Sequence, residues 1–119
     1  MSQAELTTSV RRVGDTLSIV DIQGEITSFS EAALTEAYSQ ASRGGVNTIL
    51  LNFQGLEYMN SSGIGLLVTM LIRANRQKQK LAAYGLTEHY QQIFELTRLN
   101  EAIQIFASEA EALTALPQE

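Results

Sequence analysis

Short apolar runs alternate with stretches of helical periodicity along this chain. Residues 6–13 and 17–23 flank Gly14-Asp15, a dipeptide typical of hairpin turns, so we expect two adjacent antiparallel strands. Ser28-Phe29-Ser30-Glu31 has the form of a capping box and predicts the start of a helix. The buried face of that helix is expected to consist of Phe29, Ala32, Ala33, Ala37 and Ala41.

A second helix is expected after the most apolar strand. Residues 46–53 contain Ile49-Leu50-Leu51, a run typical of a strand that is buried on both faces of a parallel sheet. Residues 54–57 are expected to break this strand. Because Asn60 or Ser61 can accept a hydrogen bond from first-turn amides, the helix is predicted to begin near Ser62.

The rest of the chain predicts two more strands and two more helices. Residues 81–84 and 103–106 are expected to be short strands, with a helix from Thr87 between them and another from Ser108 after them. The order β-β-α-β-α-β-α-β-α predicts an α/β fold, in which a mixed β-sheet of about four to five strands is covered by about four helices. The 119 residues are expected to form a single domain over positions 1–119.

Two adjacent serines stand at the predicted start of the second helix. If Ile64 faces the core, a step of about 100° per residue turns Ser62 towards water. The core side is then Leu67, Val68, Leu71 and Asn75, and the outward side is Ser62, Leu66, Thr69 and Arg73, with Met70 beside Leu66. Apolar side chains on a solvent face, next to a serine that can be phosphorylated, suggest contact with a partner protein.

Ordinary helix capping is a simpler explanation of the same residues. From local rules alone, capping serines are more common than regulatory ones, and Gly63 and Gly65 can serve only to let the helix pack closely. A phosphate-binding loop on these two glycines would lack the lysine and the third glycine that such loops carry.

The segment Tyr58-Met59-Asn60-Ser61-Ser62-Gly63-Ile64-Gly65 closely resembles the signature of bacterial anti-sigma factor antagonists, small proteins of the STAS superfamily. Other segments match the same family. Gly24-Glu25-Ile26 ends an early strand, Ile49-Leu50-Leu51-Asn52-Phe53 precedes the serines, and Leu96-Thr97-Arg98-Leu99 resembles a late helix-to-strand turn. The resemblance spans roughly the whole chain and implies a single STAS-type domain.

The resemblance implies a partner switch. In such systems the antagonist with an unmodified serine binds an anti-sigma factor, which is also a serine kinase, and so frees a sigma factor for transcription. Phosphorylation ends the binding, and a serine phosphatase restores it. Carried onto this sequence, the phosphorylated residue is Ser62, with Ser61 as the second candidate. The implied partner surface consists of Thr27, Asn60, Ser61, Ser62, Gly63, Leu66, Thr69, Met70 and Arg73.

Two positions depart from the family pattern. Asn60 stands before the serines and Thr27 follows Gly24-Glu25-Ile26, where the family commonly has Asp, so two carboxylates are missing near the serine loop. Thr27 is either a second phosphorylation site, as in some stress-signalling relatives, or a helix cap, the commoner role of such a threonine. A second hypothesis follows from these departures: an adaptor subunit of the same fold in a stress-signalling or lipid-transport complex, in which Ser62 only caps a helix.

Charge and composition restrict the possible partners. Thirteen acidic residues against eight Lys and Arg give a net charge of −5, which argues against direct binding to nucleic acid, and the basic run at 73–80 is expected to be a solvated helix end. The chain has no cysteine, so thiol chemistry is excluded. It also has no signal peptide pattern and no apolar run of the roughly 20 residues that cross a bilayer. We therefore expect a cytoplasmic protein without a membrane partner.

Enzymatic activity is not expected. A serine nucleophile needs a base, and the single histidine, His89, lies in a polar stretch where a surface position is expected. Only two aspartates exist, Asp15 and Asp21, and Glu109 and Glu111 are interpreted as a solvated helix surface, so no metal or cofactor site is predicted.

Overall fold

The computed structural model describes residues 5–118 and confirms the expected order of elements. The strands are β1 (Leu6–Val13), β2 (Leu17–Ile26), β3 (Thr48–Met59), β4 (Lys80–Tyr84) and β5 (Gln104–Phe106). The helices are α1 (Glu31–Ala41), α2 (Ser61–Arg76), α3 (Glu88–Leu96) and α4 (Glu109–Ala115). One five-stranded sheet runs in the order β1-β2-β3-β4-β5. Because β1 is antiparallel to β2 and the other neighbours are parallel, the sheet is mixed, as predicted.

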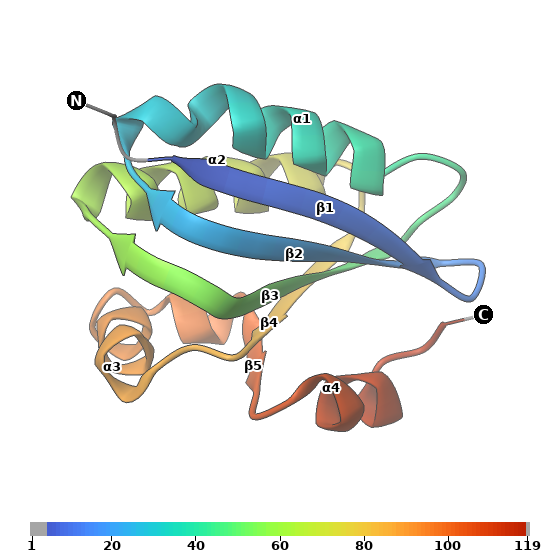
Figure 1. The fold of residues 1–119 in the computed structure, drawn as a ribbon. Coiled ribbons are helices and arrows are strands. Elements are labelled where there is room, and N and C mark those ends of the chain that lie inside the picture. The colour runs from blue at the N-terminus through green and yellow to red at the C-terminus, as the bar shows by residue number, and fades with distance from the viewer. Residues whose placement is uncertain (1–4, 119) are drawn as a thin grey trace.

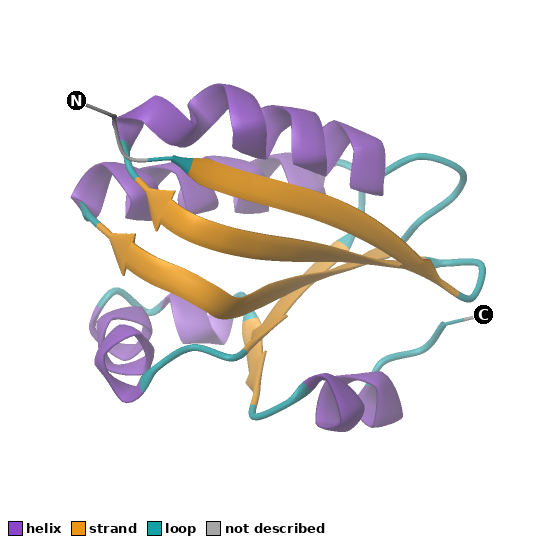
Figure 2. Cartoon of the chain, in the orientation of Figure 1, coloured by secondary structure: helices purple, strands orange, loops and turns teal. Residues whose placement is uncertain are grey.

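The helices cover the two faces of the sheet unequally (Figure 1, Figure 2). A larger core lies between one face and α1, α2 and α3, and it includes Leu34, Leu67 and Phe94. A smaller core under α4 includes Leu17 and Ala112 on the other face. Since β2 and β3 are parallel and each leads into a helix, α1 and α2 both begin at the same end of the sheet.

The start of α1 differs from the prediction. The capping box pairs Thr27 with Ser30, not Ser28 with Glu31, and a 3₁₀ turn at Ser28–Ser30 precedes the helix. This extra turn shifts the phase of the helix, so Leu34 and Tyr38 join Ala37 and Ala41 in the core. Of the residues that were expected to be buried, Phe29 and Ala32 are exposed and Ala33 is half-buried.

Strand β3 is longer than predicted. Residues 54–57 do not break it, because Gly55 and Leu56 continue to pair with β2, with a shift of register on either side of them. Gly55 allows this close pairing, since a Cβ atom there would lie 2.9 Å from the carbonyl oxygen of Ile22. The extra pairs carry β2 and β3 together to Ile26 and Met59, the point at which α2 begins.

The buried face of α2 is also rotated from the prediction. Its buried residues are Gly63, Leu67, Met70 and Ala74. Val68 and Asn75, which were expected on the core side, are exposed, and Met70, which was expected on the outward side, is only 4% exposed. The prediction failed because it fixed the face on Ile64, which is half-buried, whereas Gly63 is the residue that lies against the sheet.

Glu109 and Glu111 are not simply solvated, as the sequence suggested. Glu109 forms an ion pair with Arg11 and accepts a hydrogen bond from the Tyr84 hydroxyl, and Glu111 accepts one from the backbone N–H of Ala107. The expected surface position of His89 is confirmed. Among residues 5–118, no helix combines the length and apolar character needed to span a membrane.

Candidate functional site

The N-terminus of α2 is held against the ends of two strands. The backbone N–H of Asn60 donates to the carbonyl oxygen of Ile26 at the end of β2 (3.3 Å), and the backbone N–H of Met59 donates to the Tyr90 hydroxyl of α3 (2.8 Å). The chain therefore turns from β3 into α2 at a fixed place on the sheet, at the left of Figure 1.

Asn60 caps α2, as predicted. Its backbone is extended, with φ −99° and ψ −175°, and its side-chain Oδ1 accepts the N–H of Gly63 at 3.0 Å. Its carbonyl oxygen accepts the N–H of Ile64 at 3.0 Å. Asn60 is therefore the cap, and Ser61 and Ser62 are the first two residues of the helix. Both serines are exposed to solvent.

The two glycines of the serine motif have different surroundings. A Cβ atom on Gly63 would lie 2.3 Å from the carbonyl oxygen of Ile26, so only glycine lets the first turn of α2 approach β2 this closely. A Cβ atom on Gly65 would meet no atom within 4 Å. The fold therefore requires Gly63 but does not require Gly65.

Thr27 lies in a rigid turn beside this helix start. Its Oγ1 accepts the N–H of Phe29 (3.2 Å), and its own N–H donates to the Oγ of Ser30 (2.9 Å), which in turn donates to the carbonyl oxygen of Glu25 (3.1 Å). Thr27 is 7% exposed. It has the predicted capping role, but for the short 3₁₀ turn and not for α1 itself.

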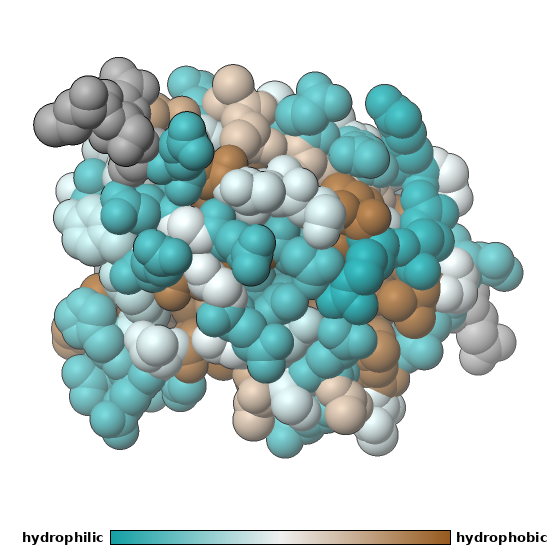
Figure 3. Space-filling model, viewed as in Figure 1, coloured by the Kyte–Doolittle hydropathy of each residue, from teal (hydrophilic) through white to brown (hydrophobic). Residues whose placement is uncertain are grey.

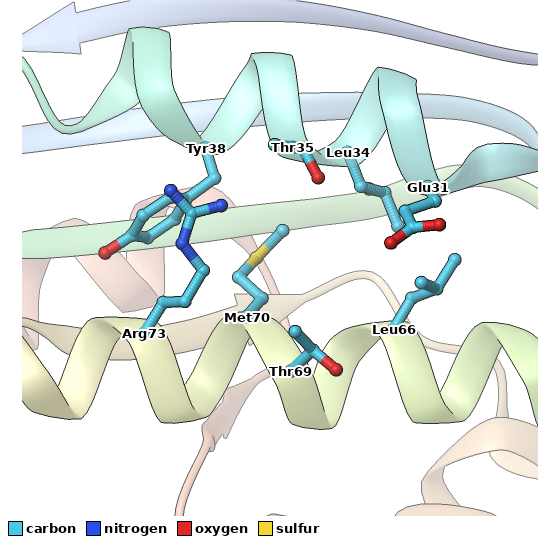
Figure 4. A pocket seen from close by; sticks show the side chains of 8 residues that line it. All are labelled: Glu31, Leu34, Thr35, Tyr38, Leu66, Thr69, Met70 and Arg73. Carbon is cyan, nitrogen blue, oxygen red and sulfur yellow. The ribbon is translucent and has the colours of Figure 1, made fainter.

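The outward residues of α2 border a groove between α1 and α2 (Figure 4). Leu66, Thr69, Met70 and Arg73 line it from α2, and Glu31, Leu34, Thr35 and Tyr38 line it from α1. The guanidinium carbon of Arg73 lies 4.6 Å from the centre of the Tyr38 ring, and the Tyr38 hydroxyl donates to Gln79 Oε1. Ser62 does not line this groove. The structure therefore brings Leu66, Thr69 and Arg73 together as predicted and places Met70 on the groove floor.

Two exposed aromatic residues were missed by the sequence analysis. Phe29 is 66% exposed in the 3₁₀ turn, and Tyr58 is 47% exposed near the end of β3. Ile26 and Met59 pair across β2 and β3, so both aromatic residues belong to segments that flank the start of α2. The apolar character of Phe29 favoured a buried position, and only the location of the capping box could have indicated otherwise.

The main charged network lies on the other face of the sheet. Arg11 donates to Asp21 at 2.6 and 2.8 Å and to Glu109 at 2.8 Å. These hydrogen bonds from Arg11 hold the pKa of both carboxyl groups below the usual range, and burial raises the pKa of Tyr84 to about 12. Every member of this network has a partner within the chain, so the network has a structural role.

No cluster of His, Asp and Glu with the arrangement of a metal site occurs in residues 5–118. Polar side chains cover much of the face shown in Figure 3, and the apolar side chains on it form separate small patches. What the start of α2 offers is an exposed hydroxyl pair on a fixed helix terminus, which suits modification or contact with a protein.

The chain is similar in sequence to known proteins. Residues 7–112 match the model of the STAS domain family. The anti-sigma-B factor antagonist of Staphylococcus aureus is 27% identical over 86 residues, which are 72% of this chain and 80% of that protein. The corresponding protein of Staphylococcus epidermidis is 26% identical over the same length.

Solved structures show the same fold. An anti-sigma factor antagonist from Mycobacterium paratuberculosis has a TM-score of 0.77 and 21% identity, and the match covers 93% of each chain. The Bacillus cell fate determinant SpoIIAA in its phosphorylated form has a TM-score of 0.65 and 22% identity, over 91% of this chain and 97% of that one. Because the STAS domain model matches residues 7–112, the chain belongs to the STAS domain family.

Proposed function

We propose that this protein is an anti-sigma factor antagonist whose binding to an anti-sigma factor ends when Ser62 is phosphorylated. Curated relatives are anti-sigma-B factor antagonists, and a relative of the same fold has been solved in a phosphorylated form. The single observation that carries the proposal is the position of Ser62, exposed in the first turn of a helix whose start is fixed by Asn60 and Ile26.

A phosphate on Ser62 is compatible with the fold. The N-terminus of a helix favours negative charge through its free amides and its dipole. Ser62 is exposed, so the phosphate needs no internal space. We therefore expect phosphorylation to leave the stability of the domain nearly unchanged.

The same phosphate opposes docking of a partner on this surface. A dianion in a packed interface loses its hydration, and that loss weakens binding unless the partner supplies cations. In the proposed cycle, the anti-sigma factor is also the serine kinase, and a serine phosphatase returns Ser62 to its binding form. The partner contacts Asn60, Ser61 and Ser62 at the helix start and extends to Leu66, Thr69 and Arg73 along α2. Thr27, Gly63 and Met70, which were also expected in this surface, are buried.

The test compares Ser62→Ala with Ser62→Asp in binding to the anti-sigma factor of the same organism. Ser62→Ala keeps the affinity of the unmodified protein, whereas Ser62→Asp weakens it by roughly tenfold or more, equivalent to about 1.4 kcal/mol. Denaturation of both variants provides the control, with stabilities expected within about 0.5 kcal/mol of wild type. Equal binding by the two variants would remove the switch and leave a non-switching adaptor, for which Ser62 is only part of a helix start.

A further inference from the structure

Phe29 is an apolar side chain that the fold presents to solvent on a rigid turn. Its side chain is 66% exposed, although hydrogen bonds hold the backbone of the turn in place. Its own backbone N–H donates to Thr27 Oγ1 (3.2 Å), and the N–H of Ser30 donates to the Thr27 carbonyl oxygen (3.0 Å). The hydroxyl of Ser30, which is 2% exposed, ties the turn to the carbonyl oxygen of Glu25.

The turn that carries Phe29 adjoins the serine helix. Thr27 follows Ile26 directly, and the carbonyl oxygen of Ile26 accepts the backbone N–H of Asn60 and lies against Gly63. Phe29 therefore lies three residues along the chain from Ile26, whose carbonyl oxygen is hydrogen-bonded to the start of α2. Tyr58, the second exposed aromatic residue, lies near the end of β3, just before the same helix start. The next residue, Met59, donates its backbone N–H to the Tyr90 hydroxyl.

Two aromatic side chains on fixed backbone are the kind of residue that dominates binding energy in protein interfaces. Because the backbone of the turn is already held by hydrogen bonds, a partner that covers the Phe29 ring does not also have to order the chain that carries it. Isolated apolar residues on a surface need no special explanation, but here both residues belong to segments that adjoin the start of the serine helix, for which a partner is proposed. The segments that carry them, 25–31 and 57–62, contain Glu25, Glu31 and Glu57 and no Lys or Arg.

We propose that Phe29 and Tyr58 are the aromatic docking residues for the anti-sigma factor, which presents an apolar pocket with a basic rim to this end of the sheet. The inference rests on the proposed function and deepens it. In this arrangement the partner covers both Phe29 and the neighbouring helix start, so a phosphate on Ser62 is desolvated by the same interface that buries the ring. The interface that buries the aromatic rings is then also the one that a phosphate on Ser62 weakens.

The test measures the affinity of the full chain for the anti-sigma factor by calorimetry, with wild type, Phe29→Ala and Tyr58→Ala. The matched control is Leu96→Ala, because Leu96 is 84% exposed but lies at the end of α3 and outside the two serine-flanking segments. We expect Phe29→Ala to weaken binding by about tenfold or more, Tyr58→Ala to weaken it in the same direction, and Leu96→Ala to change it less than about twofold. Because Phe29, Tyr58 and Leu96 are exposed, denaturation midpoints should stay close to that of wild type.

Each remaining outcome overturns the inference in a distinguishable way. If wild type binds and Phe29→Ala binds equally well, the aromatic docking is wrong and the proposed function stands. If unmodified wild type does not bind the anti-sigma factor, the proposed function and this inference both fail. If sedimentation of the protein alone reveals a dimer that Phe29→Ala abolishes, a second copy of this chain covers the ring in place of the anti-sigma factor.

Discussion

Gly63 and Gly65 are separated by one residue on α2, but their surroundings predict opposite effects of substitution. Gly63→Ala forces a Cβ atom to within 2.3 Å of the Ile26 carbonyl oxygen, a backbone atom that cannot move without disturbing the end of β2. We expect this change to lower the free energy of unfolding by about 1–3 kcal/mol. Gly65→Ala adds a side chain in open space and should raise it by about 0.5–1 kcal/mol.

Urea denaturation of the two variants beside wild type measures both effects. A similar loss of stability in both variants would contradict this account, in which close packing requires glycine at position 63 and only helix propensity matters at position 65. Gly65 is exposed and lies one helical turn after Ser61. If Gly65→Ala is more stable than wild type but binds the partner more weakly, the partner makes a close contact at this position.

At the scale of elements, α4 is attached to the sheet by charged hydrogen bonds as well as by its small core. Arg11 of β1 bridges Asp21 of β2 and Glu109 at the start of α4. Arg11→Gln should therefore lower the free energy of unfolding at pH 7 by about 1 kcal/mol, as expected for a bidentate but partly exposed ion pair. The exposed pair of Arg98 with Glu101 gives the matched control, Arg98→Gln, for which we expect less than about 0.5 kcal/mol.

The loss in Arg11→Gln should depend on pH. Arg11 lowers the folded-state pKa of Asp21 and Glu109, so the stabilisation is fully present above their unfolded pKa values of about 4 and is lost as the pH falls through the lower folded values. Unfolding curves at pH 7 and in the acid range measure this. A difference between wild type and Arg11→Gln that did not shrink in acid would contradict the assignment.

The sequence predicted those elements that depend on interactions between residues close together in the chain. The cap at Asn60, the start of α2 and the position of the short strands follow from side chains that act on their own neighbours, and these predictions are confirmed. The continuation of β3 through Gly55 depends on pairing with β2, a segment distant in sequence. The capping box of Thr27 with Ser30 is local, but the overlapping pattern at Ser28 and Glu31 concealed it.

The candidate site was predicted in the same uneven way. Ser62 was predicted to face water from a helix phase that placed Ile64 in the core. Ser62 is exposed, as is Ser61, although Ile64 is only half-buried. The burial of Met70 depends on which side of α2 lies on the sheet, and the contact of Gly63 with Ile26 decides that. Periodicity alone gives the pattern of a helix face but not its rotation, so only contacts between elements could show that Met70 faces inward.

For the whole molecule, the parallel arrangement of β2 and β3 has a direct functional consequence. The ends of both strands and the first turns of α1 and α2 meet at one end of the sheet (Figure 1). The exposed serines and the two exposed aromatic residues thus come from segments separated by about thirty residues and adjoin the same helix start. The charged network of Arg11 lies on the other face, so it shares no residue with the proposed partner surface.

The measurement that tests the central claim most directly is intact-mass and peptide-mapping mass spectrometry after incubation with the anti-sigma factor and ATP. The proposed switch predicts one added phosphate, mapped to Ser62, on wild type and none on Ser62→Ala. A phosphate mapped elsewhere, or an unmodified Ser62 in a protein that still binds its partner, would contradict the switch.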